Sequence, residues 1–117
     1  MYLFTTCTKI PLLCEGNMSV KAEQVMFHEF YHGPYIKIKI CVWKLPDKDW
    51  DRYPIKFKYS LICVHTKTGK KVLMDNHHPK GPHFHLDDRE LNYHFVDIKG
   101  LLSDFKEYCR KHMEISL

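Results

Sequence analysis

The stretch Ile36-Lys37-Ile38-Lys39-Ile40-Cys41-Val42-Trp43 decides the fold class of this chain. Its isoleucines and Val42 fall on every second position, so they share one side of an extended segment, while Lys37 and Lys39 share the other. This alternation is typical of a half-buried β-strand. The stretch therefore predicts a sheet with one apolar face and one polar face.

Segments on both sides of this strand carry the same signal. Residues 56–65 alternate in the same way, and a Lys-Thr-Gly-Lys turn at 67–70 joins them to a return strand at 71–75. Residues 20–27 suit a first strand, and residues 91–96 suit a last one. The chain therefore predicts a mostly antiparallel β-sheet of about five strands.

A helical period follows the last predicted strand. Asp97 has the side chain of an N-cap. The apolar residues after it recur at helical spacing: Ile98, Leu101, Leu102, Phe105 and Cys109. We therefore expect one amphipathic helix over residues 98–112. The fold class is α+β, with this C-terminal helix packed on one face of the sheet.

The length of 117 residues predicts a single domain, which we place at residues 18–117. Residues 1–17 form an unpatterned N-terminal extension that Pro11 interrupts. Met18 resembles a fresh start, and translation from it would leave the extension untranslated. We expect the extension to add little to the core.

Composition restricts the setting of the protein. Five cysteines, an odd number without a Cys-x-x-Cys pair, indicate a reducing cytoplasm and no disulfide framework. No apolar run approaches the roughly 20 residues of a membrane helix, so no membrane partner is expected. A formal net charge of +4 permits binding to nucleic acid or to an acidic partner.

Four of the nine histidines lie within the polar stretch of residues 75–85. Such a stretch predicts a surface loop that carries the functional site. His83 and His85 are two positions apart, so in extended backbone they point the same way. We expect Asp75, His83 and His85 to converge on one accessible pocket.

Several chemistries fit this stretch. Lys80, between two prolines, presents a cation that would hold a phosphate, while His83 and His85 would act as acid and base and Asp75 would orient an imidazole. These are the parts of a metal-independent ribonuclease, which needs no cofactor. A zinc site that adds His77 or His78 is an alternative, although the spacing follows no established zinc pattern. Another is an idle polar loop whose histidines bond only to water and backbone.

Other motifs are missing or ambiguous. The chain has no Ser-His-Asp order, no glycine-rich nucleotide loop and no Walker motif. Lysines at 37, 39, 56 and 58, with Trp43 and Trp50 nearby, could combine into a basic face for nucleic acid. A solvated sheet face explains the same lysines equally well. The charged run at residues 87–90 is read as a solvated face.

One family resembles this chain in its motifs. They are Asp75-Asn76-x-x-x-Lys80-Gly81-x-His83-x-His85, Glu90-x-x-Tyr93-x-Phe95 and Leu101-Leu102-x-Asp104-Phe105, preceded by Ile40-x-Val42-Trp43-Lys44-Leu45-Pro46 and Tyr59-Ser60-Leu61. In this order they resemble the TumE family of bacterial and archaeal toxin–antitoxin proteins. The resemblance covers about residues 18–111.

The resemblance implies the toxin half of a two-gene module that a helix-turn-helix antitoxin neutralises. Toxins of this size commonly cut RNA, so RNA is the expected target by analogy. In that case Asn76, His78, Gly81 and Tyr93 would contact the substrate. A homodimer is compatible with the sequence. The alternatives are a non-enzymatic module that binds a protein partner or nucleic acid, and a small metal-binding protein.

Overall fold

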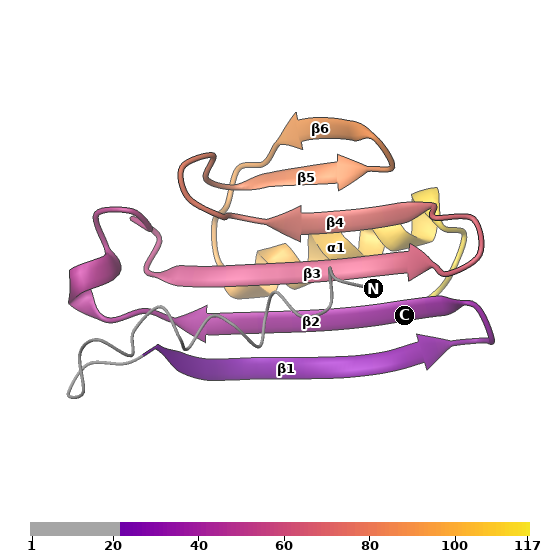
Figure 1. Cartoon of the computed structure of the whole chain (residues 1–117), viewed down its shortest axis with the longest axis horizontal. Helices are drawn as coiled ribbons and strands as arrows, with labels where there is room; N and C mark the ends of the chain where they lie inside the picture. The colour runs from indigo at the N-terminus through magenta and orange to yellow at the C-terminus, as the bar shows by residue number, and fades with distance from the viewer. Residues whose placement is uncertain (1–21) are drawn as a thin grey trace.

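The computed structural model describes residues 22–117. A six-stranded antiparallel sheet runs in the order β1 to β6, so every strand lies beside its neighbours in sequence, and helix α1 lies behind it (Figure 1). The elements are β1 (Glu23–His32), β2 (Ile36–Lys44), a short 3-10 helix (Asp47–Asp49), β3 (Phe57–His65), β4 (Lys71–Asp75), β5 (His83–Leu86), β6 (Arg89–Asn92) and α1 (Ile98–His112). The predicted fold class is confirmed, with one strand more than expected.

The apolar alternation of the central strands builds the core on the helix side of the sheet. Ile38 of β2 and the side chains of Tyr59 and Leu61 of β3 are fully buried there. Leu101 and Phe105 of α1 pack against them in the same cluster. The faces predicted for residues 36–43 and 56–65 are therefore confirmed.

Local signals set the ends of the elements. Asp97 caps α1, because its Oδ1 accepts a hydrogen bond from the Gly100 backbone N–H at 2.6 Å. The hairpin between β3 and β4 turns at Gly69, whose φ of +79° suits a residue without a Cβ. Both the N-cap and the hairpin agree with the sequence-based expectation.

Two local predictions in the last third of the chain are wrong. His83–Leu86 forms strand β5, where we expected the end of a surface loop, and β6 spans Arg89–Asn92 instead of residues 91–96. In β5 the apolar positions are Phe84 and Leu86, and the histidines that alternate with them hid the strand signal. A turn at Asp87, with φ +57°, joins β5 to β6 in a tight hairpin. The charged residues of this turn gave no hairpin signal in the sequence.

The cysteines behave in two ways. Cys63 and Cys109 are free and buried between β3 and α1, as expected of small apolar side chains. Cys41 is disulfide-bonded, which contradicts the expectation that the cysteines form no disulfide. The expected N-terminal extension, residues 1–17, lies outside the described residues. Within residues 22–117 no helix is long and apolar enough to cross a membrane.

Candidate functional site

The face of the sheet away from α1, here called the open face, brings polar residues from four strands into one row. The antiparallel register pairs Ser60 of β3 with Asp75 of β4, and Asp75 with His83 of β5. His83 in turn pairs with Asn92 of β6. Side chains of directly opposed residues lie about 5 Å apart on the same face, so this row places an acid, a base and a hydroxyl together.

A cavity of about 370 Å³ opens beside this row. Its floor is formed by strand residues Lys58, Ser60, Asp75 and His83, and its wall by loop residues 77–80. The volume lies within the range of small-molecule sites. The cavity therefore combines rigid strand positions with an exposed loop.

His83 is held between two hydrogen-bond acceptors. Its Nδ1 lies 2.7 Å from the Gly81 carbonyl oxygen, and its Nε2 lies 3.0 Å from Asp75 Oδ1. A ring that donates from both nitrogens, the imidazolium, satisfies both partners. Gly81 can offer its carbonyl from a left-handed conformation, φ +74°. The geometry suits His83 as a proton donor.

His85 lies next to His83 on the same face, with the ring centroids 5.0 Å apart and edge to face. Burial, and then the charge of His83, lower the pKa of His85. His85 therefore favours the neutral form, which can accept a proton. Unlike Asp75 and His83, however, His85 does not line the cavity.

Lys80 stands at the rim of the cavity, where its Nζ lies 2.5 Å from Glu90 Oε1. The same Glu90 oxygen is 3.7 Å from His85 Nε2. Glu90 belongs to the charged run that was read as a solvated face. It links the loop cation to the histidine pair instead.

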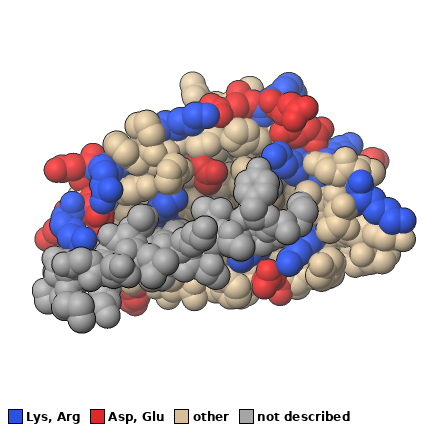
Figure 2. Space-filling view, viewed as in Figure 1, with Lys and Arg blue, Asp and Glu red and all other residues tan. Residues whose placement is uncertain are grey.

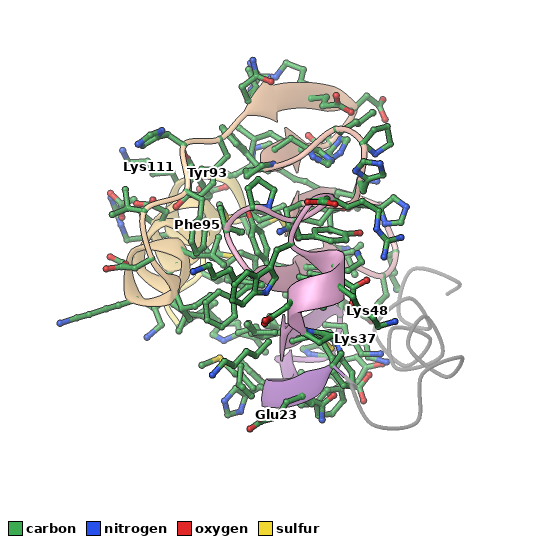
Figure 3. All side chains as sticks on the ribbon, turned by 90° about the vertical axis from the view of Figure 1, so that its left-hand side faces the viewer. Glu23, Lys37, Lys48, Tyr93, Phe95 and Lys111 are labelled. Carbon is green, nitrogen blue, oxygen red and sulfur yellow. The ribbon has the colours of Figure 1, made fainter. Side chains whose placement is uncertain are left out.

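Two of the expected substrate contacts point elsewhere. The Asn76 side chain is buried, where its Oδ1 accepts from the Tyr59 backbone N–H at 2.9 Å and its Nδ2 donates to the Phe57 carbonyl at 2.7 Å. It therefore ties the end of β4 to β3. Tyr93 lies on the helix side of the sheet, away from Lys37 (Figure 3), and its hydroxyl donates to Asp104 at 2.5 Å.

The other two expected contacts lie closer to the cavity. The side chain of His78 lines the wall, and its backbone N–H donates to the Tyr53 hydroxyl at 3.3 Å. Gly81 acts through the carbonyl that holds His83. Of the four, only His78 therefore reaches the cavity with its side chain.

Sequence reasoning did not assign Lys58 or Ser60 to the site and considered His77 only as a zinc ligand. Lys58 and Ser60 lie on the polar face of β3, but only the strand pairing shows that this part of the face adjoins Asp75. His77 lies in the histidine-rich stretch and lines the same wall as His78. Burial, followed by the charge of Lys58, lowers the pKa of His77.

Two of the four alternating lysines are buried rather than solvated. Lys39 and Lys58 are only 5% and 2% exposed, and Trp43 is buried as well. On the visible part of the open face, basic and acidic side chains are interspersed (Figure 2). The visible part of this face among residues 22–117 therefore has no continuous basic surface.

One group of residues in the described part of the chain could hold a metal ion. The nearest ligand atoms of His83, His85 and Glu90 all lie within 4.8 Å of one another. The Lys80 ammonium already contacts Glu90, and His83 Nε2 faces Asp75. A metal bound by all three residues would compete with these interactions.

Comparison with known proteins gives one match. The model of the family described as "Toxin TumE" matches residues 19–113. No curated protein and no solved structure gave a significant match. The family match covers the sheet, the cavity and the helix.

Proposed function

The chain belongs to the TumE toxin family, and on this premise we propose that it is a toxin that cuts RNA at the cavity of the open face. Membership of a toxin family implies an antitoxin partner, and we propose a helix-turn-helix protein in that role. Neither the target nor the type of antitoxin follows from the family itself. The chemistry of the site carries the proposal.

The observation that supports RNA cleavage is the unequal environment of two neighbouring histidines. The two ring nitrogens of His83 face the Gly81 carbonyl and the Asp75 carboxylate, both hydrogen-bond acceptors, whereas the pKa of His85 is lowered. A ring that faces two acceptors suits a proton donor, and a neighbouring ring with a lowered pKa suits a proton acceptor. The sheet register keeps both rings on one face.

In the proposed reaction His85 takes the proton of a ribose 2′-hydroxyl as that oxygen attacks the adjacent phosphorus. His83 gives the Nε2 proton, which faces Asp75 before RNA binds, to the departing 5′-oxygen, while the Gly81 carbonyl at Nδ1 keeps the ring in place. The products are a 2′,3′-cyclic phosphate and a free 5′-hydroxyl, so the atoms balance without water or metal. Asp75 orients the His83 ring before RNA binds, and Lys80 at the rim meets the RNA backbone.

His77 is a second candidate for the base. It lines the same cavity as His83, which His85 does not, and its pKa is lowered too. The two candidates are separable by single variants. His85→Gln and His77→Gln should differ at least tenfold in cleavage rate, because one general base contributes about 10²–10⁴-fold.

The test combines growth with chemistry. Expression of the protein in bacteria should slow growth, and a His83→Gln/His85→Gln variant should relieve the toxicity while remaining folded. The purified protein should cut an RNA oligonucleotide in the presence of a chelator, leave a cyclic phosphate and spare the 2′-deoxy analogue. Full toxicity of the folded double variant would exclude this mechanism.

The exposed edge of the sheet favours a second function, that of a non-enzymatic module that binds a protein partner. Among residues 22–117, strand β1 (ten residues) pairs with β2 alone, and it exposes Val25, Phe27, Phe30 and Tyr31. A long apolar edge without proline or lysine can accept a strand from another chain. If toxicity depends on β1 and survives loss of the histidines, this reading replaces the enzymatic one.

A further inference from the structure

Lys58 is a buried lysine whose charge the proposed reaction does not use. Its residue is 2% exposed, although lysine is almost never fully buried without a partner. The Tyr53 ring lies 5.8 Å from its Nζ. Burial lowers the pKa of Lys58, and the nearby Asp75 charge opposes that effect. Burying a charged ammonium costs free energy unless a partner or a ligand compensates for the lost water.

No acceptor in residues 22–117 hydrogen-bonds to the Lys58 ammonium, and no ion pair is formed there. The nearest carboxylate is committed elsewhere, since Asp75 Oδ1 lies 3.0 Å from His83 Nε2. Lys58 does line the cavity. Its three donors are therefore available to a ligand there.

Ser60 extends the same floor. It is two residues from Lys58 on β3, so both side chains face the cavity. Within the described part of the chain its hydroxyl has no hydrogen-bond partner. An ammonium and a hydroxyl on one rigid strand form a pair of donors that suits an oxyanion.

Lys80 offers a contrast within the same cavity. Its side chain is 59% exposed, and its ammonium is already engaged by Glu90. An exposed ion pair contributes little, and water competes for it. Of the two cavity lysines, the buried Lys58 is therefore better placed to bind a ligand strongly.

We propose that Lys58 and Ser60 form a phosphate-binding site at the floor of the cavity. A charge-assisted hydrogen bond from the ammonium and one from the hydroxyl hold the phosphate oxygens beside His83. The proposal deepens the function proposed above, because the backbone phosphate of RNA is the source that the function names. The proposal assigns the main phosphate contact to Lys58 of strand β3, and not to Lys80 of the loop.

The first experiment measures binding of inorganic phosphate alone to the full-length protein, by titration calorimetry and by amide chemical shifts. Phosphate should shift the amides of β3 and β4 around Ser60 and Asp75. Lys58→Met should weaken binding roughly tenfold or more, because a hydrogen bond to a charged group is lost. Lys80→Met, the matched control at the rim, should change it by less than about threefold.

Two further variants separate binding from folding. Lys58→Met replaces a buried charge with an apolar chain of similar length, which buried sites often tolerate. Ser60→Ala should weaken binding by a smaller factor, and its thermal unfolding checks that the sheet is intact. Absence of phosphate binding, or equal losses in Lys58→Met and Lys80→Met, would overturn the assignment.

The source of the phosphate is decided by comparing ligands. A 2′-deoxy dinucleotide, which cannot be cut by the proposed route, should bind more tightly than free phosphate if nucleic acid is the natural source. Phosphate binding without RNA cleavage would leave this site standing and remove the ribonuclease. RNA cleavage that Lys58→Met leaves unchanged would keep the ribonuclease proposal and remove the phosphate site.

Discussion

The two faces of the sheet bury their residues for different purposes, and β3 shows the contrast within one strand. On the helix side, Tyr59 and Leu61 are fully buried against apolar neighbours. On the open face, Lys58 and Ser60 are almost as buried but line a cavity. Burial alone therefore does not identify the core. The two pairs differ in what they face: Tyr59 and Leu61 pack among apolar side chains, whereas Lys58 and Ser60 face a space that a ligand could occupy.

The largest effect should come from the helix side. Phe105→Ala removes a fully buried ring from the centre of the packed cluster. We expect the free energy of unfolding to fall by about 3–5 kcal/mol, measured by urea denaturation. The exposed neighbour Lys106→Ala is the control and should stay within about 0.5 kcal/mol. A loss below about 1 kcal/mol for Phe105→Ala would mean that α1 packs loosely on the sheet.

The next effect concerns Asn76, which ties the end of β4 to β3. Asn76→Ala should lower the free energy of unfolding by about 1–3 kcal/mol, because the Tyr59 N–H and the Phe57 carbonyl lose their partner. Asn92→Ala, an exposed asparagine of β6 on the open face, should have little effect. If Asn76→Ala instead leaves stability intact and reduces RNA binding, the amide serves the substrate.

A smaller effect is expected at the start of α1. Asp97→Ala should cost about 1 kcal/mol, because the Gly100 N–H loses its cap. Asp97→Asn keeps a capping oxygen and should restore most of the stability. Activity at the cavity should not change in either variant, since the cap lies outside it. A loss of activity would show that helix docking controls the open face.

The smallest effect is a pH dependence of stability from the open face. The pKa values of His77 and His85 are lowered in the folded protein, so the unfolded chain binds these protons first as the pH falls. Stability should therefore decrease as the pH falls below about 6.5, and the loss should end below the lowered values. A His77→Gln/His85→Gln variant should show a flatter acid limb in thermal melts. An unchanged limb would assign the pH dependence to other groups.

The phosphate site offers a further test of the difference between the open face and the helix side. If Lys58→Met raises stability while it abolishes phosphate binding, the open face carries a polar group that serves the ligand at the expense of the fold. A loss of stability in exchange for function is expected where a functional site is built into a rigid element. On the helix side no substitution should have this double effect.

Local patterns were sufficient for much of the fold. The alternation at residues 36–43 and 56–65, the glycine turn at 67–70 and the helical period at 98–112 depend on near neighbours in the chain. Near neighbours determine which way successive side chains point. The motifs of the TumE family are likewise a property of the sequence, and the family match confirmed them.

The composition of the site depended on pairing between strands, which no local pattern encodes. Ser60 and Asp75 lie far apart in sequence, and only the register of β3 on β4 makes them neighbours. Strand β5 was missed because its alternate positions are histidines, whose polarity resembles that of a loop. A register shift of one residue would have moved each side chain to the opposite face.

The sequence by itself therefore determined the α+β class, the helix with its cap, the family and the histidine-rich stretch that borders the site. Only the tertiary structure decided which polar residues meet. It placed Tyr93 on the helix side, committed Asn76 to the backbone and brought Lys58 to the cavity floor. The physical reason is that side-chain direction is a local property of a strand, whereas burial and partnership arise from contacts between strands.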